Sequence, residues 1–254
     1  MSLELTLDDA IVLVTGGERG VGLGVTRAFQ RAGAIVLSCG RTTPAAPAAE
    51  FLPCDVREPD AVHRMLDTLT ERHGRLDVLV NNAGGSPYAM AGTASPRFHE
   101  KIVALNLLAP LLVAQRANEI MQRQERGGVI IMVSSVSATR PSPGTAAYGA
   151  AKAGLDNLTA SLAVEWAPKV RVNALDVGPV RTERAALHYG DAGGIDAVGR
   201  TIPLGRLAEP DDVGGCAVFL ASPLAGYVSG ARLLVHGGGE VPAFLAASTA
   251  VHES

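Results

Sequence analysis

Tyr148 and Lys152 are the pair of residues in this sequence best suited to acid–base chemistry. They stand four positions apart in "YGAAK", within a stretch that reads as a helix, so both side chains project from one face toward the same point. A phenol ordinarily titrates at about pH 10, and a neighbouring ammonium stabilises its phenolate form. We therefore expect Lys152 to lower the pKa of Tyr148. The tyrosine can then exchange a proton with a carbonyl or alcohol oxygen.

A serine is expected to act on the same oxygen. Ser135 ends the apolar run "GGVIIMVSS", which reads as a buried strand, and the next residues lead toward the Tyr148 helix. In open α/β folds, ligands bind at the carboxyl ends of the strands, where Ser135 would stand. Its neighbour Ser134 is the alternative donor.

A glycine-rich turn supplies a second kind of chemistry. In "TGGERGVG", the glycines at 16, 20 and 22 follow a strand and open a helix. This geometry lets main-chain N–H groups and the helix N-terminus approach a pyrophosphate closely. The spacing is T-G-x-x-x-G-x-G, because Val25 stands where the commoner G-x-G-x-x-G pattern requires a glycine.

Strand-like and helix-like segments alternate along the chain, and this alternation predicts the scaffold that positions these residues. Strands that are apolar throughout are buried on both faces, which is typical of a parallel, doubly wound α/β sheet. The expected strands are 10–16, 35–39, 51–54, 78–81, 127–135, 170–175 and the final "ARLLVHG", and the expected helices are 21–32, 60–73, 97–124, 148–166 and 210–221. Only about ten residues separate Cys39 from Glu50, so we expect a loop there with little or no helix.

Composition excludes several other classes of protein. The 254 residues are 47% hydrophobic, enough for the core of one domain, and the net charge of −3 with no basic block argues against nucleic-acid partners. No apolar run approaches the roughly 18 residues that cross a bilayer, and the acidic N-terminus is unlike a signal peptide. Three scattered cysteines predict neither disulfides nor a metal site and favour a cytoplasmic location.

Several motifs together resemble the short-chain dehydrogenase/reductase family. "TGGERGVG", "NNAG" at 81–84 and "YGAAK" with a serine 13 positions earlier occur in the order of that family, and "CDV", "VRVNAL" and "IPLGRLAEPDDV" extend the resemblance over nearly the whole chain. The resemblance implies a Rossmann-type, three-layer fold with a seven-stranded parallel sheet in a single domain, 1–254. Within it, the cofactor half is about 1–135, the catalytic half about 136–240 and the tail 241–254.

The resemblance also assigns roles to residues. The catalytic set would be Asn106, Ser135, Tyr148 and Lys152, with Lys152 also holding the nicotinamide ribose and Asn106 ending a proton relay through water. Pro110 supports the last role, because proline has no N–H to pair with the Asn106 carbonyl in a helix. The expected cofactor-binding residues are Gly16, Glu18, Arg19, Gly20, Val21, Gly22, Arg41, Asp55, Val56, Asn82, Ala83, Gly84, Tyr148, Lys152, Gly178, Val180 and Thr182.

The choice of cofactor depends on the end of the second strand. Family members that use NAD carry an acidic residue there for the adenosine ribose, and the same place in this chain falls on Gly40. Arg41 and Arg19 instead offer guanidinium groups suited to a phosphate dianion. The pattern favours NADP(H), with NAD(H) as the alternative.

Three functions are consistent with these residues. The first is an NADPH-dependent carbonyl reductase that converts a ketone or ketoacyl group to a secondary alcohol reversibly, and the second is an NAD-dependent secondary alcohol dehydrogenase. The third is a non-catalytic NADP-sensing protein on this fold, which would not need Ser135, Tyr148 and Lys152 together. The partner is a small carbonyl or alcohol substrate, with neither nucleic acid nor membrane. Relatives pair through helices rich in Ala and Leu, here 97–124 and 148–166, so a homotetramer (or a homodimer) is expected.

Overall fold

Seven parallel strands form one sheet in the order β3-β2-β1-β4-β5-β6-β7 in the computed structural model, which describes residues 5–249. The central strands are buried on both faces, as their continuous apolar runs require. Their bounds are β1 (Ile11–Thr15), β2 (Ile35–Gly40), β3 (Glu50–Pro53), β4 (Val78–Asn81), β5 (Gly128–Ser135), β6 (Val170–Val177) and β7 (Arg232–Val235). The seven-stranded parallel sheet expected from the sequence is confirmed.

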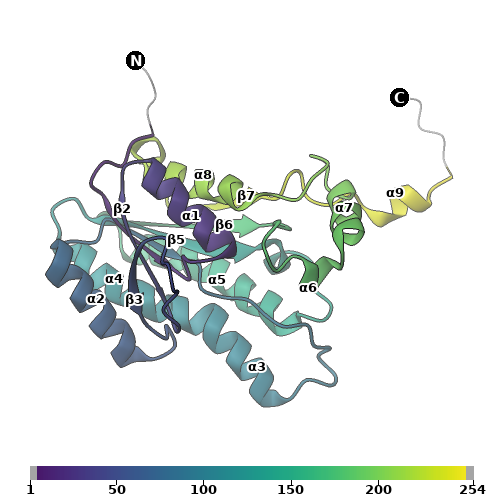
Figure 1. Ribbon diagram of the computed structural model, residues 1–254, viewed down its shortest axis with the longest axis horizontal. Coiled ribbons are helices and arrows are strands. Elements are labelled where there is room, and N and C mark those ends of the chain that lie inside the picture. Colours follow the sequence, from purple (N-terminus) through teal and green to yellow (C-terminus); the bar gives the residue numbers. More distant parts are fainter. Residues whose placement is uncertain (1–4, 250–254) are drawn as a thin grey trace.

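Helices cover both faces of the sheet and give the fold three layers (Figure 1). α1 (Gly20–Arg31) and α8 (Pro210–Ala221) cover one face of the sheet. They pack against strand side chains such as Leu175 of β6. α2 (Pro59–His73), α4 (Ala109–Arg123) and α5 (Ala146–Glu165) cover the other face. The crossovers that connect parallel strands must carry helices across a face, which is why two helical layers result.

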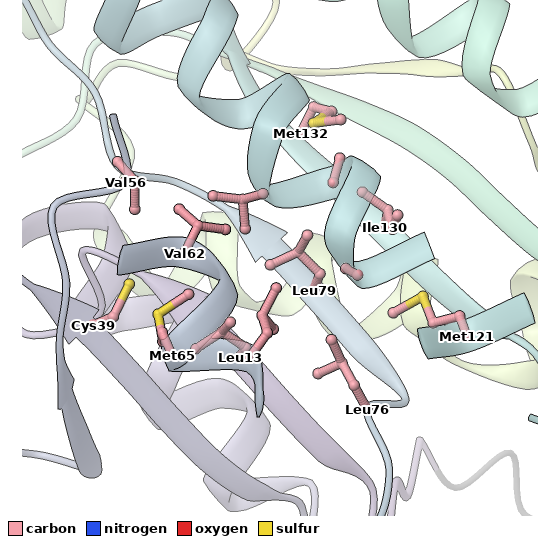
Figure 2. Packing of buried hydrophobic residues seen from close by; sticks show 14 of the residues in the cluster. Leu13, Cys39, Val56, Val62, Met65, Leu76, Leu79, Met121, Ile130 and Met132 are labelled. Atoms are coloured by element: carbon pink, nitrogen blue, oxygen red, sulfur yellow. The ribbon is translucent and has the colours of Figure 1, made fainter. Parts of the chain in front are cut away.

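The core beneath α2 and α4 holds the centre of the sheet in place. Figure 2 shows Leu13, Leu79 and Ile130 from neighbouring strands packing against Met65 of α2 and Met121 of α4. All five side chains are at most 3% exposed. Fully burying a side chain of this size stabilises the fold by about 1.5–3 kcal/mol, so this layer fixes where the strand ends lie.

The connection between β2 and β3 contains no helix, as its length predicts. Two side chains from the neighbouring elements hold this loop in place. Gln30 of α1 donates through Nε2 to the Ala48 carbonyl at 2.8 Å, and the Ala48 N–H donates to Glu18 Oε2 at 2.7 Å. The other carboxylate oxygen of Glu18 accepts from Ser38 near the end of β2. Arg41 and Thr42 lie exposed in this loop.

Other boundaries differ from those expected. The stretch 97–124 is divided into α3 (Pro96–Val103), a π-helical segment (Ala104–Leu108) and α4, because the proline at 110 cannot donate within an uninterrupted α-helix. β6 continues two residues beyond Leu175, and three short helices were not expected: α6 (Ala186–Tyr189), α7 (Ala192–Arg200) and α9 (Ala243–Ala247). Over residues 5–249, no helix has both the length and the apolar character needed to span a membrane.

Candidate active site

The glycine-rich turn between β1 and α1 is packed too tightly to accept side chains. A β-carbon built at Gly22 would stand 2.2 Å from the Gly16 carbonyl oxygen, and Gly16 itself has a φ of +66°, which favours glycine. Asn82, just after β4, donates through Nδ2 to the carbonyls of Thr15 (2.9 Å) and Gly16 (3.2 Å). The turn is therefore held open at the carboxyl edge of the sheet, with its main chain accessible to a phosphate group.

Tyr148 and Lys152 lie in the first two turns of α5 and face the end of β5. The Lys152 ammonium is 5.6 Å from the centre of the Tyr148 ring, and it donates to the Val133 carbonyl at 2.7 Å. Lys152 is only 4% exposed, whereas Tyr148 is partly exposed. The pair expected from the sequence spacing does converge on one point.

The electrostatics of this pair correct one sequence-based expectation. Burial raises the pKa of Tyr148 above its ordinary value, while a hydrogen bond with the hydroxyl of Ser135 acts in the opposite direction. Burial also lowers the pKa of Lys152 to about 8, against the opposing effect of Asp156 and Asp176. The ammonium lies over the tyrosine ring and is bonded to a carbonyl, and its field does not offset the burial of the phenol, so the net pKa of Tyr148 is raised rather than lowered.

The two serines at the end of β5 are placed differently. Ser135 lies at the strand terminus, and its Oγ accepts a bond from the Ser137 N–H at 3.2 Å. Ser134 points to the α5 side, where its Oγ donates to the Lys152 carbonyl at 3.4 Å, and it is 3% exposed. Ser135 is thus the serine whose hydroxyl acts on Tyr148, as the 13-residue offset indicates.

Asn106 is buried within the π-helical segment, and its side chain is fully engaged. Its Nδ2 donates to the carbonyls of Ile102 (2.9 Å) and Gly85 (3.0 Å), and its Oδ1 accepts from the Gly85 N–H at 2.8 Å. A β-carbon at Gly84 would stand 2.7 Å from this Oδ1 and 3.6 Å from Lys152 Nζ. Asn106, Gly84 and Lys152 are therefore immediate neighbours.

The segment after β6 folds back toward the glycine-rich turn. Gly178 donates its N–H to the Val235 carbonyl at 3.0 Å, and buried Val180 forms a bridge with Ala208. Thr182 lies against Gly20, and the neighbouring Glu183 accepts a hydrogen bond from the Gly20 N–H at 3.2 Å. The path through Val177, Gly178 and Pro179 thus brings Thr182 to the turn.

The expected adenosine end of the site lies beside β2 and β3. Gly40 ends β2 with open space around it, since a β-carbon there would meet only Phe51 at 3.6 Å. The side chains of Arg19 and Arg41 are exposed and form no hydrogen bond or ion pair within the described part of the chain. Asp55 is paired with Arg57, which lowers its pKa, and the Val56 side chain packs in the core.

Known proteins match this chain over nearly its whole length. The family described as Enoyl-(Acyl carrier protein) reductase matches residues 16–240. L-rhamnose 1-dehydrogenase (NAD(P)(+)) of Azotobacter vinelandii is 36% identical over 92% of this chain and 98% of its own. Dehydrogenase/reductase SDR family member 4 of Homo sapiens is 30% identical over 91% and 88%. The chain belongs to the short-chain dehydrogenase/reductase family.

A solved structure agrees with this membership. The ligand-free aldohexose dehydrogenase of Thermoplasma acidophilum superposes with a TM-score of 0.88 at 29% identity, covering 98% of each chain. As a short-chain dehydrogenase/reductase, the chain is an oxidoreductase acting on alcohol or carbonyl substrates, and its family typically uses NAD(P). The glycine-rich turn fits such a cofactor, because glycines without room for side chains let the chain turn directly into the N-terminus of α1, where main-chain N–H groups suit a phosphate group.

An open hollow lies beside the start of α5, and none of Ser135, Tyr148 and Lys152 lines it. A cavity of about 290 Å³ is lined by Ser137, Arg140, Ser142 and the outer face of α5. Arg140 forms an ion pair at 2.8 Å with Glu240, from the segment after β7. Tyr189 of α6, from the segment after Thr182, lies near enough to raise the pKa of Tyr148.

Three further charged residues beside Lys152 were missed by sequence reasoning. Asp156 stands one turn beyond Lys152 on α5, Asp176 lies in β6, and Arg232 in β7 reaches Asp156 at 3.3 Å. The signal was present in the sequence, because Asp176 places an acidic side chain in the strand "VNALDV", which is predicted to be buried. An acidic residue in a strand buried on both faces is rarely incidental.

Proposed function

We propose that this short-chain dehydrogenase/reductase is an NADP(H)-dependent carbonyl reductase that converts a ketone or ketoacyl group to a secondary alcohol, reversibly, with Tyr148 as the acid and base. The observation that supports it most is the convergence of Ser135, Tyr148 and Lys152 at the carboxyl end of β5. A sensor protein on the same fold would have no need of these three groups at one point. The residues are those that proton transfer at a carbonyl oxygen requires.

In the proposed mechanism, residues of this chain transfer the proton and orient the substrate oxygen. A bound nicotinamide cofactor supplies or accepts the hydride at carbon. Tyr148 donates its phenolic proton to the substrate oxygen during reduction and removes it during oxidation. Ser135 donates a hydrogen bond to the same oxygen, and the charged Lys152 stabilises the resulting phenolate through its field.

The cofactor would be held by three sets of groups. The main chain of Gly20, Val21 and Gly22 at the start of α1 would bind the pyrophosphate, and Lys152 the nicotinamide ribose. Thr182, which lies against the turn, would face the carboxamide. Arg19 and Arg41 support a preference for the 2′-phosphate of NADP, because both are exposed cations and Gly40 offers no competing carboxylate.

A second candidate is the oxidation of a sugar or polyol by the same residues. Two similar proteins are named for sugars, L-rhamnose and aldohexose.

A substrate panel with both cofactors tests the proposal and separates the two candidates. Simple ketones, ketoacyl thioesters, aldoses and polyols would each be assayed with NADP(H) and NAD(H). Tyr148→Phe should reduce the turnover number by about 10²–10⁴-fold while leaving the cofactor dissociation constant within about threefold. Tyr88→Phe is the matched control, since Tyr88 is 71% exposed. Undiminished turnover in Tyr148→Phe would contradict the proposed role.

A further inference from the structure

Two buried carboxyl groups beside Lys152 lack ordinary hydrogen-bond partners. Asp176 is 0% exposed, and neither of its carboxylate oxygens forms a hydrogen bond within residues 5–249. Asp156 is 4% exposed; its Oδ1 has no partner in the same region, and its Oδ2 is 3.3 Å from the guanidinium of Arg232. A buried carboxylate without partners costs so much free energy that it normally acquires a proton.

The fold brings these groups together from three elements. Asp176 pairs in register with Ser134 of β5 and faces the α5 side of the sheet. Lys152 and Asp156 stand four positions apart and therefore share one face of α5, and Arg232 approaches from β7 at the sheet edge. These are the charged groups that act on Asp176, together with the Ser134 hydroxyl.

The charges of this cluster influence one another strongly. Burial and the neighbouring Asp156 raise the pKa of Asp176 to about 6, while Arg232 acts in the opposite direction. Both carboxylates favour the charged form of Lys152, whose pKa is lowered by burial. Removing negative charge from Asp156 or Asp176 therefore makes it easier for Lys152 to lose its proton.

We propose that Asp156 and Asp176 form a proton-sharing carboxyl pair that keeps the Lys152 ammonium charged, which makes Asp176 a positioning residue for the reaction. In mildly acidic solution the pair carries one shared proton and one negative charge. As that proton leaves to solvent, the pair gains a second negative charge and holds the ammonium more strongly. The consequence for catalysis rests on the proposed function, but the protonation states do not.

Thermal stability measured against pH tests the shared proton without any turnover. The native state holds the Asp176 proton more tightly than the unfolded chain does, so the contribution of this group to stability is lost as pH rises from about 4 to about 6. Asp176→Asn removes this loss, and its melting temperature should exceed that of the unmodified protein by an increment that grows over this range to on the order of 5 °C. Arg232→Gln should move the transition to higher pH.

Asp67→Asn is the control, because Asp67 lies on α2 in a half-buried ion pair with Arg116, away from this cluster. Its melting-temperature difference should not grow between pH 4 and 6. A difference for Asp176→Asn that stays constant from pH 4 to 8 would overturn the shared proton. Asp156→Asn serves as the second variant if Asp176→Asn does not fold.

The charge on Lys152 can also be read directly, because the chain has only three lysines, Lys101, Lys152 and Lys169. Carbon-13 labelling at lysine Cε gives three NMR signals, assigned with Lys101→Arg and Lys169→Arg. In Asp176→Asn, the Lys152 signal should titrate about one pH unit lower than in the unmodified protein. An unshifted Lys152 titration would overturn the link to the lysine. Failure of all substrates to turn over would count against the proposed function alone.

Discussion

Asn106 and the main chain of Gly85 form two hydrogen bonds that run in opposite directions, 2.8 Å into Oδ1 and 3.0 Å from Nδ2. This reciprocal contact ties the π-helical segment to the loop that follows β4. With the additional bond to the Ile102 carbonyl, the amide side chain of Asn106 is fully used. A role for Asn106 in proton relay must therefore fall to its main-chain carbonyl, which the sequence argument about Pro110 had singled out.

Asn106→Ala should lower the free energy of unfolding by about 1–3 kcal/mol, because it removes the three hydrogen bonds of a buried amide and leaves the buried Ile102 carbonyl without this partner. Chemical denaturation would measure this loss. Asn118→Ala on α4, whose side chain only accepts a bond from Gln122, should cost clearly less. Equal losses in the two variants would mean that the contact with Gly85 contributes little.

Pro110→Ala tests the relay without touching the Asn106 side chain. Proline in a helix interior costs about 3 kcal/mol relative to alanine, but Pro110 stands in the first turn of α4 after a π-helical segment, where proline is tolerated. Thermal stability should therefore hold or rise slightly, and NADPH affinity should not change. Turnover should fall, because the new N–H can claim the Asn106 carbonyl. Unchanged turnover across pH would show that Pro110 serves packing alone.

Exchanging two residues at the end of β2 should reverse the cofactor preference. We expect NADPH to bind at least about tenfold more tightly than NADH, which is about 1.4 kcal/mol. Gly40→Asp with Arg41→Ala supplies a carboxylate for the ribose and removes a cation for the phosphate, and the β-carbon at 40 has room. Fluorescence titration with both cofactors measures the order. Equal affinities in the unmodified protein would refute the preference.

The pH dependence of carbonyl reduction should reflect Lys152. Burial lowers the pKa of this lysine to about 8, so its ammonium is lost as pH rises through that value. Since the charged form supports the Tyr148 phenolate, the turnover number should decline above about pH 8 with saturating cofactor. Lys152→Arg keeps its charge throughout this range and should turn over more slowly without that decline. The same alkaline decline in Lys152→Arg would assign it to another group.

Assembly into a homotetramer is the remaining expectation. Val164 on α5 is 79% exposed, and Leu108 at the end of the π-helical segment is 55% exposed, as an interface on these helices would require. Light scattering at micromolar concentration should give about four times the chain mass of 26.1 kDa. Val164→Lys should yield smaller species with an unchanged circular dichroism spectrum. A monomer mass for the unmodified protein would contradict the expectation.

Periodicity and motif spacing predicted the scaffold well, because a parallel sheet imposes uniform burial on its strands. Ile11–Thr15 and Val78–Asn81 are continuous apolar or small segments, and both are central strands. The convergence of Tyr148 with Lys152 also followed from spacing, since i and i+4 share a helix face. The π-helical turn at Ala104–Leu108 could not be read in this way, because it depends on how a proline is accommodated by its neighbours.

Electrostatic interactions between residues far apart in the sequence could not be predicted either. The spacing of Tyr148 and Lys152 suggested a lowered phenol pKa, whereas burial of both groups and the bond from Lys152 to Val133 determine the outcome. The cluster around Asp176 joins residues 76 positions apart in sequence, Asp156 and Arg232. Only the order of strands in the sheet brings such groups together.

The helix-free connection between β2 and β3 would make the outer wall of the proposed adenosine site easy to exchange. Its conformation depends on side chains of Glu18 and Gln30, which hold the loop through the main chain of Ala48. Almost any residue supplies a main-chain N–H and a carbonyl at position 48, so residues 41–47 can be substituted while Glu18 and Gln30 are kept. Loop libraries at this one place could therefore vary cofactor recognition without repacking a helix against the sheet.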